Sequence, residues 1–556
     1  MMETASRTLA AIPAVVLAAV GRGDGAAGAR LLRRLVGLAL VGLLAALLGR
    51  VWHPVYRFTG LLQLDGRNEA RMLGAVRAAP VAYFDGGYDG QFYAQLACDP
   101  SLRDPELPKA IDSLSYRARR ILLPAVAWAA GFGRPEWAFH VYSWLNIAGW
   151  LVLAGLLWPL LEADRRWLGL LAWTGVMFSA GMLVSVRYAL TDLPAVLLFV
   201  LAMRAATPAG RAGWFGACLL TRESMLVGAW GLLEKAWDRP GRLVRPLGWL
   251  AAALVPLLLW VAYVRWRAGQ TSGGIGNFAW PGSGLLGDWR EGWAALASGQ
   301  ERKYAVLSVL ATFSLTLQAV FLVVGWNPAD RWWRAGAGSV ALLLVLGPAV
   351  WEGLFGANLR VLLPLTLACN VLALRRRGAL WWLLAFNLSV PAAISEMTPI
   401  LDHRELATVR RGAAAAVLRG NDGCYGRERL GESLWVWMQP QAEWTLRSWT
   451  GGERTALILS AKVRGIDVRV LTISHGAREL WRGSVGAEWL EVRLDLGEVP
   501  EGVSSLVFRS DAPAVRESDE PDARSLAVCV LNPVLELDTV SAEENAGDRS
   551  GTGARP

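Results

Sequence analysis

The chain has 556 residues, of which 54% are hydrophobic and only 19% charged, and its mean hydropathy is +0.33. A soluble globular protein rarely combines these values, so the composition indicates an integral membrane protein. The net charge is +9, but the basic residues cluster in short loops between apolar runs. This is the positive-inside pattern of membrane proteins. The sequence has no basic stripe with interleaved aromatic residues, which argues against a nucleic-acid partner.

The N-terminal region is predicted to hold a leader, one membrane span and a large loop. Residues 1–30 contain a short apolar stretch and read as an interfacial or disordered leader. The run 35–49 predicts the first spanning helix, and the arginines before it place its start in the cytoplasm. The polar segment 51–120 is then expected outside, as a first extracytoplasmic loop too long to be a simple connector.

Residues 31–400 as a whole predict a polytopic α-helical membrane domain of about ten spans. A spanning helix needs about 20 mainly apolar residues. After the first loop, apolar runs occur at 121–133, 137–161, 167–186, 189–206, 212–233, 246–264, 304–325, 337–351, 359–374 and 379–397. The first of these is too short to span and predicts a re-entrant or interfacial helix.

Five basic connectors then lie on the cytoplasmic side, at 164–166, 204–211, 235–245, 331–334 and 375–377. This threading requires the run 212–233 to enter and leave the membrane on one side. The break Thr221-Arg222-Glu223 within that run predicts a hairpin of two half-helices. A single span would instead place 235–245 outside, against the charge rule.

The C-terminal region predicts an all-β sandwich at 423–540, followed by a disordered tail at 541–556. Apolar residues alternate in Ala456–Ser460, Val468–Ile473, Leu490–Leu496 and Ser505–Phe508, with Gly, Asp and Pro between. The charge pattern places this domain outside. Its two cysteines, Cys424 and Cys529, could form a disulfide there. The cysteines and histidines of the chain are scattered and argue against a zinc site.

The first loop carries two carboxylates among glycines and aromatic residues, in Tyr83-Phe84-Asp85-Gly86-Gly87-Tyr88-Asp89-Gly90-Gln91-Phe92-Tyr93. Glycines let a backbone approach a ligand closely, aromatic faces suit sugar rings, and an aspartate can act as a general base toward a hydroxyl. The alternative is a solvated turn with aromatics at the membrane interface. Asp85 with Asp89 could hold a divalent cation, but two carboxylates predict no metal or cofactor by themselves.

A second motif later in this loop is Asp112-Ser113-Leu114-Ser115-Tyr116-Arg117-Ala118-Arg119-Arg120. Its three arginines suit a phosphate or pyrophosphate, because guanidinium binds such groups bidentately and stays charged. The alternative is anchoring to anionic lipid head groups.

Several ionisable residues fall in or near the apolar runs, and such residues are candidate functional groups by default. They are Arg187, Asp192, Arg222, Glu223, Glu352 and Arg360. Two alternatives remain open: Asp192 with Pro194 suits the start of a helix, and Arg222 and Glu223 could pair with neighbouring helices.

With these motifs in view, residues 30–400 resemble bacterial membrane glycosyltransferases of the GT-C type, which use polyprenyl-phosphate sugars, and their uncharacterised relatives. The segments that carry the resemblance are 88–93, 112–124, Thr191-Asp192-Leu193-Pro194, Leu220-Thr221-Arg222-Glu223 and Asn358-Leu359-Arg360. The resemblance implies a catalytic acid in the first loop, which nominates Asp89 and, second, Asp85. It implies substrate binding by Tyr88, Gln91, Tyr93, Asp112, Tyr116, Arg117, Arg119, Arg120, Arg187, Asp192, Arg222, Glu223 and Arg360.

The motif departs from many such enzymes, which have a compact Asp-Glu or Glu-x-Asp in this loop. The C-terminal segments 431–437 and 522–527 resemble a sandwich domain appended to bacterial sugar-handling proteins.

The leading hypothesis is a multi-pass enzyme of the bacterial inner membrane that moves a sugar from a lipid-linked donor to an extracytoplasmic glycan, lipid or protein acceptor. Asp89 is the expected base, with its pKa raised by burial or by Asp85. One alternative is a transporter or flippase of a lipid-linked saccharide, although the halves show no repeat symmetry. Another is a non-catalytic envelope assembly protein, which predicts that Asp89 faces solvent far from Arg117–Arg120.

Overall fold

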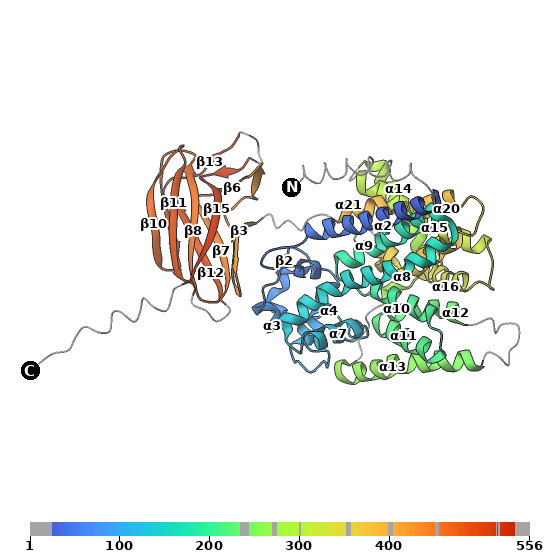
Figure 1. Cartoon of the computed structure of the whole chain (residues 1–556). Coiled ribbons are helices and arrows are strands. Elements are labelled where there is room, and N and C mark those ends of the chain that lie inside the picture. Colours follow the sequence, from blue (N-terminus) through green and yellow to red (C-terminus); the bar gives the residue numbers. More distant parts are fainter. Residues whose placement is uncertain are drawn as a thin grey trace, which may run out of the picture. The chain divides into compact units, whose positions relative to one another are not determined.

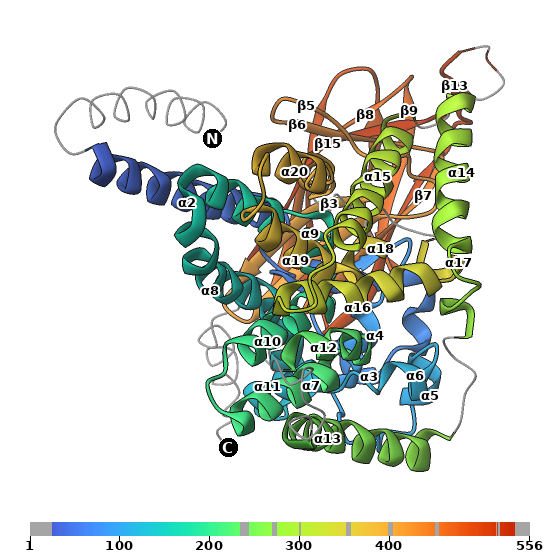
Figure 2. The same ribbon diagram turned by 90° about the vertical axis from the view of Figure 1, so that its right-hand side faces the viewer.

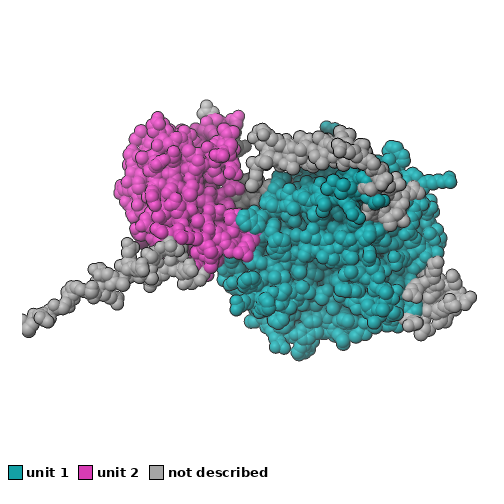
Figure 3. All heavy atoms as spheres, in the orientation of Figure 1, with its two compact units in different colours: residues 1–52, 58–399 teal, residues 53–57, 400–556 magenta. Residues whose placement is uncertain are grey.

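The structure is a computed structural model that describes residues 25–233, 244–269, 275–299, 302–351, 357–397, 404–450, 455–518, 520 and 523–539. The predicted connector 235–245 therefore falls almost wholly outside the described residues, as do Glu352, the tail after 540 and most of the leader. The chain divides into two compact units, coloured in Figure 3. Unit 1 comprises 1–52 and 58–399, and unit 2 comprises 53–57 and 400–556.

Unit 1 is helical, as predicted (Figure 1). Its α-helices are α2 (Gly25–Gly49), α3 (Gly74–Ala78), α4 (Gly90–Leu96), α5 (Leu107–Ala110), α6 (Leu114–Arg117), α7 (Leu122–Ala130), α8 (Pro135–Met177), α9 (Ala180–Arg187), α10 (Asp192–Arg204), α11 (Pro208–Thr221), α12 (Ala229–Leu232), α13 (Val244–Ala268), α14 (Ser283–Ser298), α15 (Arg302–Val324), α16 (Arg331–Val345), α17 (Pro348–Trp351), α18 (Ala357–Val361), α19 (Leu363–Ala373), α20 (Ala379–Phe386) and α21 (Val390–Glu396). Figure 2 shows α13 along one edge of this unit.

Five described helices are long and apolar enough to cross a membrane, or up to six if a bent pair forms one span. They are Gly28–Gly49, Pro135–Leu161, Pro246–Ala268, Arg302–Val324 and Ala379–Glu396, and the bent pair is Trp167–Met177 with Ala180–Arg187. The prediction of about ten spans is therefore not supported. The reason is that several apolar runs form shorter helices: α10 has 13 residues, α11 has 14 and α19 has 11.

Helix α8 contains the predicted run 137–161 and the first part of the run 167–186, which continues in α9, and α8 folds back on itself. The Trp150 indole donates to the carbonyl of Met177 at 2.8 Å, and the Trp173 indole donates to that of Ala154 at 3.0 Å. In a straight helix, residues 150 and 177 would lie about 40 Å apart. The two runs therefore pack side by side as separate segments.

The predicted break within 212–233 is present. Helix α11 ends at Thr221, Arg222 is extended (φ −159°, ψ 112°), and the 3₁₀ helix η3 (Glu223–Gly228) leads into α12. The two half-helices exist, while the side of the membrane on which they begin and end stays a prediction.

The first loop is folded rather than extended. Short helices η1 (Thr59–Leu62), η2 (Gly66–Arg71) and α3 to α6 surround a two-stranded parallel pairing of β1 (Leu64–Asp65) with β2 (Tyr83–Phe84). Leu61, Leu62 and Tyr93 are buried in it. This packing fixes the backbone that carries the Asp89 motif.

Unit 2 is all-β and consists of two antiparallel sheets, as predicted. One sheet has the order β10-β9-β12-β7-β4-β3 and the other β11-β8-β15-β6-β5. The strands are β3 (Glu405–Arg411), β4 (Ala414–Gly420), β5 (Glu428–Leu430), β6 (Ser433–Met438), β7 (Gln441–Trp449), β8 (Thr455–Gly465), β9 (Arg469–His475), β10 (Arg478–Val485), β11 (Leu490–Glu498), β12 (Gly502–Ser510) and β15 (Val528–Thr539), with a small pair β13 (Val515–Arg516) and β14 (Ser525–Leu526). Both sheets contribute to one core that contains Trp444 and Phe508.

The sandwich begins earlier than predicted and includes a piece of the first loop. Strands β3 and β4 precede position 423. The prediction missed them because their alanine- and arginine-rich sequences lack a clear alternation of apolar and polar residues. Residues 53–57 belong to unit 2. There the imidazole of His53 pairs with Glu405 at 3.0 Å, and Arg410 donates to the carbonyl of Val55 at 3.0 Å.

The disulfide considered for Cys424 and Cys529 is not formed, and both thiols are free. Cys424 lies opposite Met438, whereas Cys529 lies opposite Trp437. Neighbouring residues of a strand point to opposite faces of a sheet, so the two thiols are directed apart.

Candidate functional site

Asp89 lies at the start of α4, between two arginines from distant parts of the sequence. One carboxylate oxygen is 2.8 Å from Nη1 of Arg117, and the other accepts a hydrogen bond of 3.0 Å from Nη2 of Arg360. The Asp89 side chain is 19% exposed. A carboxylate held in this way by two guanidinium groups is fixed in position and stays charged.

The glycines and aromatics of the loop motif fix this position by close packing. A Cβ atom on Gly90 would lie 2.2 Å from the carbonyl oxygen of Tyr188, which leaves no room for any other residue. The ring of Tyr88 lies against that of Tyr188, with centroids 4.7 Å apart. The Gln91 side chain accepts a hydrogen bond from the amide of Asp65, so its role in the structure is to hold the loop.

Arg360 joins Asp89 to a second carboxylate. Asp192, at the start of α10, is fully buried, and its oxygens lie 3.6 Å from Nη1 of Arg360 and 3.0 Å from Nη1 of Arg222. Arg222 occupies the break after α11, and Arg360 lies on α18. The ion pairs thus link the first loop, α10, the helix break and α18.

Arg120 forms the other strong pair of the site. Its guanidinium donates to both carboxylate oxygens of Glu223, at 3.0 and 2.9 Å, and to the hydroxyls of Tyr93 and Tyr116, at 2.8 and 2.9 Å. Arg120 is 5% exposed. A buried charge without partners is costly, so these four hydrogen bonds are what allows the Arg120 guanidinium to be buried.

Arg117 is bound on its far side by the exposed Asp112, with bonds of 3.0 and 2.8 Å. We define the charge cluster as Asp89, Asp112, Arg117, Arg120, Asp192, Arg222, Glu223 and Arg360. Four arginines and four carboxylates balance in charge, and all eight were singled out from the sequence.

The expectation that the pKa of Asp89 is raised is wrong. Burial acts to raise this pKa, but the charges of Arg360 and Arg117 outweigh it and hold the pKa well below its usual range. The exposed Asp85 lies near Arg67 and is not part of the charge cluster. Asp89 is therefore ionised at neutral pH in this arrangement.

Two other nominated arginines lie beside the cluster. Arg119 stands over the ring of Tyr116, 5.9 Å from its centroid. Arg187 is buried, donates weakly to Gln63 at 3.4 Å, and lines a cavity of about 10 Å³ with Tyr188 and Glu396. Within the described ranges, no group of three or more His, Cys, Asp or Glu side chains is placed to hold a metal ion.

The sequence did not single out Tyr142 or Asn277. Tyr142 on α8 is fully buried, interacts electrostatically with Asp89 and Asp192, and its hydroxyl has no hydrogen-bond partner among the residues that the structure describes. Asn277 donates to the Tyr116 hydroxyl at 3.1 Å. The one signal for Tyr142 in the sequence was a tyrosine inside an apolar run, and no pattern marked Asn277.

Comparison with known proteins gave no match: no protein-family model, no curated protein and no solved structure is significantly similar to this chain. The roles of the site residues thus depend on geometry and chemistry alone.

Proposed function

We propose that the protein is a membrane glycosyltransferase of the GT-C type that transfers a sugar from a polyprenyl-phosphate carrier to an extracytoplasmic acceptor. The observation that carries the proposal is the position of Asp89 between Arg117 and Arg360. The site combines a carboxylate that can accept a proton with guanidinium groups that can bind a phosphate.

In the proposed reaction, the acceptor hydroxyl attacks the anomeric carbon of the donor sugar. The bond from that carbon to the phosphate oxygen breaks, and the phosphate leaves with the electron pair. Its charge is neutralised by Arg117 and Arg360, while the hydroxyl proton passes to a carboxylate oxygen of Asp89.

The low pKa of Asp89 makes it a weak base as long as both arginines are paired with it. Donor phosphate competes for the same two guanidinium groups. Weaker pairing raises the pKa of a buried carboxylate, so donor binding itself activates the base.

The test is a one-sided transfer assay on the full chain in vesicles, with a radiolabelled polyprenyl-phosphate hexose or pentose and envelope extract as acceptor source. We expect Asp89→Asn to lower the rate by about 10²- to 10⁴-fold, as for loss of a general base. The matched control is Asp85→Asn, an exposed aspartate of the same loop outside the cluster, which should retain transfer.

A flippase is the alternative favoured by one observation, the buried Asp192–Arg222 pair at a helix break. It predicts that labelled donor appears intact on the opposite side of the vesicle without sugar release. Sugar transfer without such movement excludes it.

A further inference from the structure

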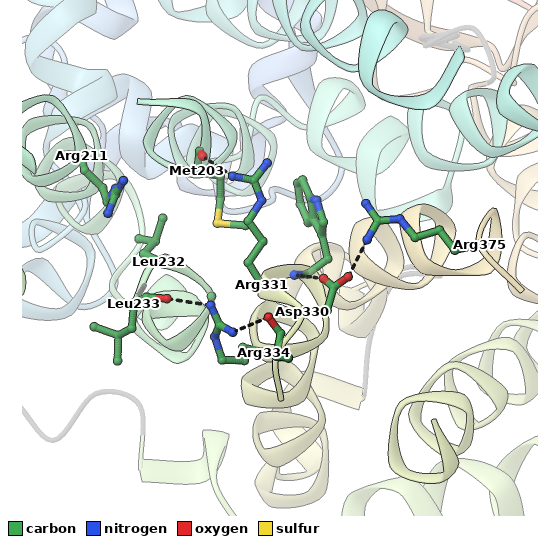
Figure 4. A pocket seen from close by; sticks show the side chains of 11 residues that line it. Met203, Arg211, Leu232, Leu233, Asp330, Arg331, Arg334 and Arg375 are labelled. Atoms are coloured by element: carbon green, nitrogen blue, oxygen red, sulfur yellow. Dashed lines mark hydrogen bonds and ion pairs between the residues drawn. The ribbon is translucent and has the colours of Figure 1, made fainter. Parts of the chain in front are cut away.

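A cavity that is lined by four arginines and by no residue of the charge cluster is shown in Figure 4. Its volume is about 530 Å³, within the range typical of small-molecule sites. The lining arginines are Arg211 at the start of α11, Arg331 and Arg334 at the start of α16, and Arg375 after α19.

Three of the basic connectors found in the sequence, 204–211, 331–334 and 375–377, therefore meet in one cavity. The charge pattern predicts this end of the helices to face the cytoplasm. Among the described residues that line the cavity, Asp330 is the one carboxylate, which leaves a surplus of three positive charges on that part of the lining.

Asp330 is already committed to other groups. It pairs with Arg375 at 2.5 Å and accepts hydrogen bonds from the backbone amides of Trp332 and Trp333, which caps α16. Its charge is thereby balanced by one guanidinium and by the positive end of the helix dipole.

Arg334 is structural. It is 2% exposed and donates to the carbonyls of Trp230, Leu233, Pro328 and Ala329, which ties α12 to the turn before α16. It contributes charge to the cavity but has little capacity for a ligand.

Arg211 and Arg331 are better placed to bind an anion. Arg331 is exposed, donates to the carbonyl of Met203 at 3.2 Å and stands over the Trp332 ring; Arg211 stands over the Trp249 ring. Figure 4 shows both at the cavity, which the apolar side chains of Leu232 and Leu233 also line. Guanidinium groups beside an apolar wall suit a ligand that has a phosphate and an apolar part.

We infer that this cavity is a second site, separate from the charge cluster, that binds a phosphate-bearing ligand through Arg211 and Arg331. Two sources share this chemistry: the head group of an anionic phospholipid and a free phosphate compound. The inference does not depend on the proposed transferase activity.

The test uses the full chain in detergent with three probes: phosphatidylglycerol and phosphatidylcholine by native mass spectrometry, and inorganic phosphate by calorimetric titration. We expect selective retention of phosphatidylglycerol if the source is lipid, and phosphate binding that displaces it if the source is soluble. The double variant Arg211→Gln with Arg331→Gln should weaken the bound probe at least about tenfold.

The matched control is Arg376→Gln with Arg377→Gln, which removes the same charge from exposed neighbours that do not line the cavity. It should leave binding unchanged. Equal losses in both double variants, or binding of neither phosphatidylglycerol nor phosphate by the wild type, would overturn the inference. Because Arg331 is exposed, Arg331→Gln alone provides a folded variant in which a loss of about tenfold is still expected.

Discussion

Replacing Asp89 by asparagine should destabilise unit 1, because it leaves two arginines short of a negative charge. Removing one partner of a buried ion pair costs about 3–5 kcal/mol. Asp89 is 19% exposed, and Arg117 and Arg360 keep Asp112 and Asp192 as second partners. The expected loss is therefore smaller, about 2 kcal/mol. At about 2 °C per kcal/mol for a unit of this size, the midpoint of thermal unfolding should fall by about 4 °C.

The assay is thermal unfolding of the purified full chain in detergent, with Asp85→Asn as control. The control should change stability by less than about 0.5 kcal/mol, because Asp85 is exposed. A double-mutant cycle of Asp89→Asn with Arg360→Gln should give a coupling energy of about 1–2 kcal/mol. Equal shifts for both aspartate variants, or a coupling energy near zero, would refute the ion-pair geometry.

Two further predictions concern the same loop. Since folding lowers the pKa of Asp89, its carboxylate contributes to stability above its unfolded pKa of about 3.9, and this contribution is lost as the pH falls further. The difference in unfolding temperature between wild type and Asp89→Asn should therefore shrink below about pH 4. A constant difference from pH 7 to 3 would contradict this. Gly90→Ala should lower both stability and sugar transfer, because its Cβ would lie 2.2 Å from the Tyr188 carbonyl oxygen. Gly86→Ala is the matched control and should be neutral in unfolding and transfer assays, because the nearest atom to its Cβ would be Nη2 of Arg67 at 3.6 Å, an ordinary van der Waals distance.

Much of the fold follows from hydropathy alone. The runs 246–264 and 304–325 became α13 and α15, and the alternating segments near 457, 470, 493 and 507 became β8, β9, β11 and β12. The number of spans could not be obtained this way. Apolar composition marks burial, and helices such as α10 and α19 are buried against other helices of the unit whether or not they cross a bilayer.

Four residues of the charge cluster were predictable because charge is costly in an apolar run. These four are Asp192, Arg222, Glu223 and Arg360. Their partners were not predictable: nothing in the spacing shows that Arg120 reaches Glu223 across 103 residues. The predicted rise in the pKa of Asp89 was wrong for the same reason: its burial was predicted, but the neighbouring Arg360, which lowers the pKa, was not.

The most direct test of the central claim is the rate of sugar release from polyprenyl-phosphate hexose by Asp89→Asn and by Asp85→Asn, each corrected for the folded fraction. The account predicts a loss of about 10²-fold or more for Asp89→Asn and near wild-type rates for Asp85→Asn. Sugar release by folded Asp89→Asn at the wild-type rate would contradict it.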